Sequence, residues 1–379
     1  LAAAEAAGGF RGNLFFDLWI AISHFMRNAG ERCPVCLRPH GAAPAAGRCW
    51  PCGRELCAFR YEEFLVSVRA ELQRDPGLAE LQLMLAAAAA EGPPETFEPF
   101  PPHFLRHREL RGRSGALGAE AAGGDAANKD MAAVRAAVAR LPRVEALLRA
   151  RTEEELCELL GGGRGAGPPP AYRLLQFVLG TNRLSLERVA HEEHKLPQVP
   201  PGAAQLAALA GPPAAERGFL ERRRKHGSAF GFHGSPLHRW YSILRNGLRV
   251  LSNTGLMTSG ARFGSGVYLA REAATAAHYC DGFAGSGYPC ALGEPLQVLG
   301  VVEYINDPTC CKLHSEGIVT VSDPGALMLR YILIYSKSAQ ALHLSFSAEE
   351  LGVSGRYARL QEHVAARRTA AEAGPSGAG

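Results

Sequence analysis

The hydrophobic pattern of this chain changes its period near residue 230. Upstream, apolar residues recur at helical spacing in the ranges 10–27, 60–91, 130–160 and 171–189. Downstream, short apolar runs bounded by turn residues are typical of strands, at 230–233, 266–270, 296–305, 317–321 and 329–337. Helices first and strands afterwards predict an α+β fold.

Two changes in composition divide the chain. Residues 93–105 are rich in proline and residues 111–127 are rich in glycine and alanine, and neither composition is typical of a packed core. We therefore expect four parts: a helical, cysteine-rich module over 10–92, a Pro/Gly/Ala-rich linker over 93–129, a second globular unit over 130–362 and a disordered tail over 363–379. Within the first module, Asp75-Pro76-Gly77 predicts a break between two helices.

Charge and composition exclude some classes of protein. The net charge of +4, from 41 basic and 37 acidic residues, does not single out nucleic acid, and no basic face for it is evident. The longest apolar run, at 81–90, is too short to span a bilayer. Ten cysteines in 379 residues are too few for a secreted disulfide scaffold, which favours an intracellular protein of either the cytoplasm or the nucleus.

The cysteines cluster near the N-terminus in a pattern typical of metal sites. CPVC at 33–36 and CWPC at 49–52 are two Cys-x-x-Cys pairs, and each such turn presents two sulfurs from one side. This spacing predicts a structural zinc ion held by Cys33, Cys36, Cys49 and Cys52. Cys57 is close enough in sequence to replace one of the four, and buried or redox-active thiols are the alternative to metal.

Two segments downstream combine a histidine, glycine turns and aromatic side chains. The first is FGFHGSPLHRWYSILRNGL at 230–248, with a histidine between a strand and a Gly-Ser turn. The second is FGSGVYLAREAATAAHYCD at 263–281, where Gly264 and Gly266 allow close approach of a ligand and Tyr268 and Tyr279 offer faces for a planar ring. A tripeptide such as HGS is weak evidence by itself, and simple packing is the alternative for each of these residues.

Taken together, these segments resemble the catalytic core of the poly(ADP-ribose) polymerase superfamily, the diphtheria-toxin-like ADP-ribosyltransferases. The resemblance covers roughly residues 150–340. The whole chain is most similar to the cysteine-rich mono-ADP-ribosyltransferase branch, through GRELCAFRYEEF (53–64), GTNR (180–183) and FHGSPLHRWYSILRNGL (232–248). The resemblance implies that the second unit is a helical lead-in followed by an ADP-ribosyltransferase fold, with two packed, mainly antiparallel sheets and flanking helices.

The resemblance also assigns roles at an NAD+ site. It implies that His233 holds a ribose hydroxyl, that Gly234 pairs its backbone with the nicotinamide carboxamide, and that Ser235 belongs to the same binding motif. Tyr268 and Tyr279 would enclose the nicotinamide ring. Such a clamp orients the bond between ribose and nicotinamide for attack through an oxocarbenium-like state.

Two positions depart from the polymerising members of the family. Those members carry a glutamate in a late strand, and the alignment of the following strand puts Ile318 at that position. Glu316 lies two residues earlier, on the same face of an extended strand, and a slip in register would place it there instead. Ala276 stands where many members have a serine that bonds the carboxamide, and we expect the adjacent Thr275 to point elsewhere.

The resemblance therefore implies a mono-ADP-ribosyltransferase that uses NAD+ as substrate and releases nicotinamide. Its partners would be acceptor proteins, with automodification among the outcomes, because transfer of a single unit does not need the glutamate that elongates a chain. Ala276 and Ile318 leave a second hypothesis open, an inactive NAD- or ADP-ribose-binding scaffold. A zinc-finger protein that binds nucleic acid is a third, disfavoured by the lack of a basic face.

Overall fold

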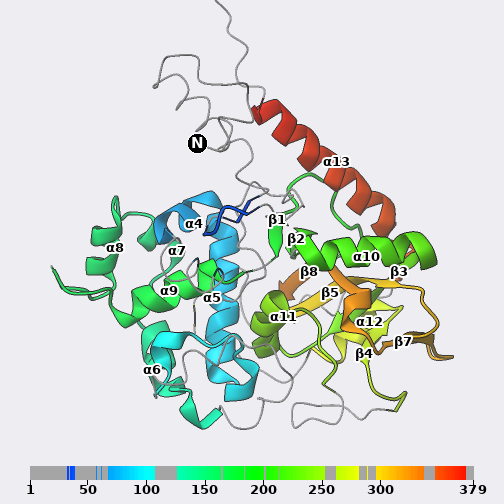
Figure 1. The fold of residues 1–379 in the computed structure, drawn as a ribbon, viewed down its shortest axis with the longest axis horizontal. Helices are drawn as coiled ribbons and strands as arrows, with labels where there is room; N and C mark the ends of the chain where they lie inside the picture. Colours follow the sequence, from blue (N-terminus) through cyan, green and yellow to red (C-terminus); the bar gives the residue numbers. More distant parts are fainter. Residues whose placement is uncertain are drawn as a thin grey trace, which may run out of the picture.

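The structure is a computed structural model, and it describes the chain in segments (Figure 1). The described residues are 32–33, 35–38, 57, 61, 67–106, 126–163, 165–182, 184–199, 202–211, 213–251, 262–280, 288, 296–336 and 346–372. A group of helices, drawn in blue to green, lies beside a sheet with its own covering helices (Figure 1). The helix expected over 10–27 lies outside the described residues.

The helical group begins with the two helices predicted around Asp75. It comprises α4 (Val68–Arg74), α5 (Pro76–Glu91), α6 (Met131–Val138), α7 (Val144–Leu147), α8 (Glu153–Leu159) and α9 (Pro170–Gly180). Asp75 ends the first helix and caps the second, because its carboxylate accepts a hydrogen bond of 2.9 Å from the Leu78 amide. Proline at the first position of α5 loses no helical hydrogen bond there. The predicted break is confirmed.

Helix α5 is the centre of this group. Its residues Ala86–Ala90 are at most 2% exposed, and α5 contacts α4, α6, α7 and α9 as well as α11 of the sheet unit. Alanine side chains let neighbouring helices approach closely from several sides. The proline-rich passage also packs here, through the short 3-10 helices η2 (Pro94–Thr96) and η3 (Pro102–Phe104). Its phenylalanines Phe97, Phe100 and Phe104 are buried in the same apolar cluster.

The described residues contain eight strands, which form one mainly antiparallel sheet in the order β1-β2-β8-β5-β3-β4-β7-β6. The strands are β1 (Ser185–Arg188), β2 (Ala204–Ala210), β3 (Ser228–Gly234), β4 (Val267–Ala270), β5 (Leu296–Ile305), β6 (Cys311–Leu313), β7 (Ile318–Val321) and β8 (Leu327–Ser336). The α+β class is confirmed, and five of these strands fall where the sequence predicts them. The other three, β1, β2 and β6, are not predicted by the pattern.

The sheet is nearly divided between β3 and β4. These neighbours share a single residue pair, Phe232 and Ala270, whereas β3 pairs with β5 over its whole length. We expected two packed sheets, and the described strands instead join at this pair into one. The reason is that β4 meets β3 only at its last residue, Ala270, whereas all four of its residues pair with β7, so β3 and β4 diverge into a fork.

Four helices flank the sheet: α10 (Pro213–His226), α11 (Trp240–Asn246), α12 (Ala273–Ala277) and α13 (Val353–Glu372). Helix α13, red in Figure 1, continues to Glu372, beyond Glu362 where we expected order to end. In the described part of the chain, none of the helices combines the length and the apolar character that a membrane crossing requires.

A buried charge network connects the sheet to these helices. Arg330 of β8 donates to Glu303 of β5 at 2.8 Å, to Glu216 of α10 at 2.9 Å and to the Tyr357 hydroxyl of α13 at 3.3 Å. Arg330 and Glu303 are each 2% exposed. The pKa of Glu303 is lowered: burial opposes the charged form, but the Arg330 guanidinium and the Ser228 hydroxyl outweigh it. The network is therefore an ionised one, and each member depends on the others.

Replacement of Arg330 by leucine should be strongly destabilising. Arg330→Leu leaves the Glu303 carboxylate buried without its main counter-ion, and removal of one partner of a buried ion pair typically costs about 3–5 kcal/mol in the free energy of unfolding. Urea denaturation of the full chain measures this loss. The double variant Arg330→Leu/Glu303→Gln should recover part of it, and a loss under about 1 kcal/mol in the single variant, the size of an exposed pair, would contradict the network.

Candidate active site

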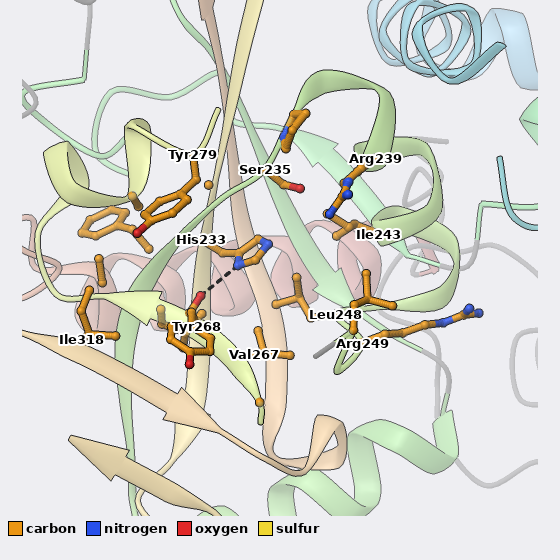
Figure 2. A pocket seen from close by; sticks show the side chains of 18 of the residues that line it. His233, Ser235, Arg239, Ile243, Leu248, Arg249, Val267, Tyr268, Tyr279 and Ile318 are labelled. Atoms are coloured by element: carbon orange, nitrogen blue, oxygen red, sulfur yellow. Dashed lines mark hydrogen bonds between the residues drawn. The ribbon is translucent and has the colours of Figure 1, made fainter. Parts of the chain in front are cut away.

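A cavity of about 360 Å³ opens at the fork between β3 and β4. His233 and Gly234 come from the end of β3, Tyr268 from β4 and Ile318 from the start of β7. Ser235 follows β3 and Tyr279 follows α12. All six residues that the sequence assigns to NAD+ and catalysis therefore line one cavity (Figure 2).

His233 is fixed by a hydrogen bond across the fork. Its Nδ1 lies 3.0 Å from the backbone oxygen of Tyr268, drawn as a dashed line in Figure 2. A carbonyl only accepts, so Nδ1 must carry the proton. Burial lowers the pKa of His233, with a smaller contribution from the positive charge of Arg239, so the ring is neutral at pH 7. The other nitrogen, Nε2, is then a bare acceptor in a residue that lines the cavity.

Gly234 leaves no space for a side chain because α12 lies directly against it. A Cβ atom built on Gly234 would be 1.8 Å from the Ala276 carbonyl oxygen. The close contact brings the backbone of the His-Gly-Ser turn against the C-terminal end of α12, the helix that leads to Tyr279. Packing against α12 thus requires a glycine at position 234, independently of any ligand.

Trp240 supports the turn from behind. Its indole Nε1 donates a 3.0 Å hydrogen bond to the Ser235 carbonyl, and the side chain is fully buried. The ring occupies the space above Gly300 of β5, where an added Cβ would meet Trp240 Cη2 at 2.7 Å. The tryptophan of the HGS…W pattern therefore holds the loop that carries Ser235.

The two tyrosines differ in how firmly they are held. The Tyr268 hydroxyl donates to the Gly264 carbonyl at 2.7 Å and accepts from the Phe263 amide at 3.0 Å, which orders the glycine turn before β4. Tyr279 is 50% exposed, a high value for an aromatic side chain beside a cavity. One aromatic wall is fixed and the other is accessible to solvent.

The residue that the sequence assigns to the third catalytic position, Ile318, is aliphatic and lines the cavity. Ile318 pairs with Ala270 in the β4–β7 ladder and packs against the apolar cluster under β4. Glu316 also lines the cavity, but its carboxylate is paired with Arg262, at 2.6 Å and 3.0 Å for the two oxygens. Both residues named as alternatives from the sequence are therefore near the site, with the acid at its exposed edge.

The cavity also contains residues that the sequence patterns did not single out. Arg239 and Arg249 line it on one side of His233 in the view of Figure 2, and Tyr268 and Tyr279 lie on the other. Thr275, which we expected to point elsewhere, is among the lining residues as well. Arg239 lies inside the quoted 230–248 segment, so its position next to the motif was the available signal.

The structure describes two of the four cysteines predicted to bind zinc, Cys33 and Cys36, together with Cys57. Cys33, Cys36 and Cys57 place their sulfur atoms within 4.8 Å of one another. The turn between the first two closes with a hydrogen bond of 2.8 Å from the Leu37 amide to the Cys33 carbonyl, and Leu37 takes a positive φ of 61°. Cys49 and Cys52 lie outside the described residues. Cys57, named from the sequence as a possible replacement ligand, belongs to this cluster.

Comparison with known proteins agrees with this geometry. Residues 212–303 match the family model of the poly(ADP-ribose) polymerase catalytic domain. Among curated proteins, the chain is 30% identical over 253 residues to protein mono-ADP-ribosyltransferase PARP8 of Homo sapiens and of Mus musculus, an alignment of 63% of this chain. It is 24% identical over 307 residues to protein mono-ADP-ribosyltransferase PARP16 of Mus musculus, covering 72% of this chain and 83% of that protein.

The resemblance seen in the sequence motifs is therefore confirmed, because residues 212–303 are similar to the poly(ADP-ribose) polymerase catalytic domain. This matched segment includes β3, β4 and the His-Gly-Ser turn, the elements that build the cavity. The alignment spans 27% of the length of the PARP8 proteins.

Substitution of Gly234 by alanine should damage the site through sterics alone. The added methyl group overlaps the Ala276 carbonyl, so β3 or α12 must shift, and overpacking of this kind typically costs about 1–3 kcal/mol. We expect Gly234→Ala to lower the melting temperature and to weaken NAD+ binding. Gly218→Ala in α10 is the matched control, since nothing lies within 4 Å of a Cβ there. Equal melting temperatures for the two variants would contradict the contact.

Proposed function

We propose that this protein transfers one ADP-ribose from NAD+ to a protein side chain and releases nicotinamide. The observation that carries the proposal is the convergence of His233, Gly234, Tyr268 and Tyr279 on one cavity, within a segment that matches the poly(ADP-ribose) polymerase catalytic domain. The names of the PARP8 and PARP16 relatives, protein mono-ADP-ribosyltransferases, support the same activity.

The polar groups of the cavity suit the two ends of NAD+. Nε2 of His233 is available to accept a hydrogen bond from a ribose hydroxyl, and Tyr268 and Tyr279 offer faces to the nicotinamide ring. On the other side, burial lowers the pKa of the Arg239 guanidinium, which still stays charged at neutral pH. A partly desolvated cation of this kind is stabilised by an anion, so we assign the diphosphate of NAD+ to Arg239 and Arg249.

The chemistry follows from this orientation. The bond between C1′ of the ribose and the nicotinamide nitrogen breaks, and nicotinamide leaves with the bonding electrons. The positive charge develops on the sugar in an oxocarbenium-like state, and a nucleophilic side chain of the acceptor protein attacks C1′. The protein contributes mainly by holding ring and sugar in the geometry for this displacement.

Single transfer is the expected outcome because the third position is Ile318. Chain growth requires a group that activates a hydroxyl of the ADP-ribose already attached, and an aliphatic side chain neither accepts a proton nor holds a hydroxyl. Glu316 is engaged by Arg262 at the rim. The acceptor side chain must then be a nucleophile by itself.

A non-catalytic function remains the second candidate, favoured by one observation. Ala276 offers no hydroxyl to the nicotinamide carboxamide, so NAD+ would be held by fewer contacts than in relatives with serine there. Thr275 lines the same cavity and is the available source of a replacement hydroxyl. An inactive scaffold that binds NAD+ or ADP-ribose is the function that results if this contact is not replaced.

We further propose that the cysteine cluster holds a structural zinc ion. Cys33 and Cys57 are at most 4% exposed, and three sulfurs within 4.8 Å of one another fit a tetrahedral thiolate site. Cys33, Cys36 and Cys57 supply three ligands, and Cys49 or Cys52 is the fourth by sequence. Zinc at this site would stabilise the N-terminal part and take no part in the transfer.

Loss of the His233 ring should abolish transfer. With biotin-labelled NAD+ and the purified full chain, His233→Ala should reduce automodification at least about 100-fold, in the range expected for an interaction used in the transition state. His278→Ala is the matched control, because His278 is exposed and its ring bonds the Ala274 carbonyl of its own helix. Wild-type chain that binds NAD+ without acquiring label would instead establish the scaffold function.

The same label tests the protonation state of His233. Protonation puts a proton on Nε2 and removes the acceptor for the ribose hydroxyl. Because burial lowers the pKa of His233, the KM for NAD+ should stay constant down to about pH 6.5, the ordinary pKa of histidine, and rise only below it. A rise in KM that begins above pH 7 would show that a different group controls binding.

The products should carry single ADP-ribose units. Labelled wild-type chain should give one discrete band shift, and poly(ADP-ribose) glycohydrolase should release no oligomers. Glu316→Gln should leave both results unchanged, because the Glu316 carboxylate is paired with Arg262 at the edge of the cavity. Ladders in the wild-type chain that disappear in Glu316→Gln would identify Glu316 as the elongating base.

A further inference from the structure

A cluster of histidines lies outside the cavity, where the loop after β1 meets α13. His191 and His194 belong to one turn of this loop, in which the His194 amide donates to the His191 carbonyl at 3.0 Å. His363 comes from α13, and its ring centroid is 5.1 Å from that of His191 and 5.0 Å from that of His194. None of these residues lines the NAD+ cavity. The cluster therefore calls for its own explanation.

The nitrogen atoms of this cluster are buried without hydrogen bonds. His194 is 3% exposed, and within the described residues neither of its ring nitrogens has a hydrogen-bond partner. The nearest acid, Glu193, approaches Nε2 of His194 at 3.5 Å, beyond a normal hydrogen bond. Nε2 of His363 is likewise buried and unpartnered in this part of the chain. An unsatisfied buried polar atom destabilises a fold, so three of them in one place point to a ligand-binding site.

The donor atoms are arranged as metal ligands would be. Glu193, His194 and His363 each offer one atom, and these atoms lie within 4.8 Å of one another. Zinc bonds of about 2.0–2.1 Å to nitrogen place tetrahedral ligands roughly 3.4 Å apart, a contraction within reach of small side-chain rotations. His191 is exposed at the edge of the cluster and is suited to be a fourth ligand.

We propose that Glu193, His194 and His363 bind a divalent transition-metal ion, Zn²⁺, that fastens helix α13 to the β1–β2 side of the sheet. Imidazole nitrogens with one carboxylate are a ligand set that suits zinc rather than magnesium or calcium. The site is separate from the cysteine cluster and does not depend on the transferase proposal. Its function is structural, since it joins two segments remote in sequence.

The charges around the cluster are compatible with a cation. Arg359 on α13 adds positive charge near His194, and Arg356 donates to the Glu193 carbonyl at 3.1 Å. The Glu193 carboxylate opposes that positive charge. Glu193 would thus both ligate the ion and offset the arginines.

Zinc titration of the metal-stripped full chain tests this proposal. The triple variant Cys33→Ser/Cys36→Ser/Cys57→Ser removes the cysteine ligands, and it should still bind one equivalent of Zn²⁺ by isothermal titration, where the wild-type chain binds two. Adding His363→Gln or Glu193→Gln should weaken this equivalent by at least the 10- to 100-fold that loss of an outer-shell partner alone produces. His278→Gln in the same background should have no effect.

Stability supplies a second measurement. Zn²⁺, but not Mg²⁺, should raise the melting temperature of the triple cysteine variant, because an ion that binds only the folded state shifts the equilibrium towards it. The shift should disappear in His363→Gln, whose melting temperature without metal shows that it folds. A triple variant that binds no zinc, or a His363→Gln chain that binds it as tightly as its parent, would overturn the proposal.

Discussion

The hydrogen bond from His233 to the Tyr268 carbonyl is the contact on which the cavity depends. Strands β3 and β4 share one residue pair, so beyond Phe232 and Ala270 the ladder between them is open. The imidazole spans that opening at 3.0 Å and satisfies a carbonyl that has no partner strand on that side. The same bond fixes the proton on Nδ1 and leaves Nε2 bare. The need to satisfy the Tyr268 carbonyl thereby sets which ring nitrogen of His233 carries the proton.

The helical group packs against α11, the helix that supports the His-Gly-Ser turn beside this fork. Helix α11 carries Trp240, which bonds the Ser235 carbonyl, and Tyr241, whose ring lies 4.4 Å from that of Phe97 and whose hydroxyl donates to the Pro99 carbonyl. Arg245 of the same helix donates to the Val178 carbonyl of α9 at 2.5 Å. Residues of the proline-rich passage and of α9 therefore fix the helix that supports the His-Gly-Ser turn, and the helical group takes part in shaping the cavity.

Strands with β-branched and aromatic residues were predictable from the sequence, as were six of the residues that line the cavity, although Arg239 and Arg249 were not. Strand β2 was not, because AQLAALA has the composition of a helix and becomes a strand only by pairing with β8 and β1. The single-pair joint between β3 and β4 is likewise a property of strand pairing that no local pattern contains. The contacts of His363 with His191 and His194 were not predicted for the same reason. Their partners are distant in sequence, and motif spacing describes only neighbours.

The aliphatic residue at position 318 and the acid at position 316 are linked by the packing around β7. Ile318 lies against an apolar cluster that includes Ala270 and Phe346, so an ionised carboxylate there would lose hydration on one side. Arg262, the cation near this edge, is already paired with Glu316. A glutamate at position 318 would thus have to compete with Glu316 for the Arg262 guanidinium. The pairing of Glu316 with Arg262 and the apolar surroundings of Ile318 both disfavour an ionised carboxylate at position 318.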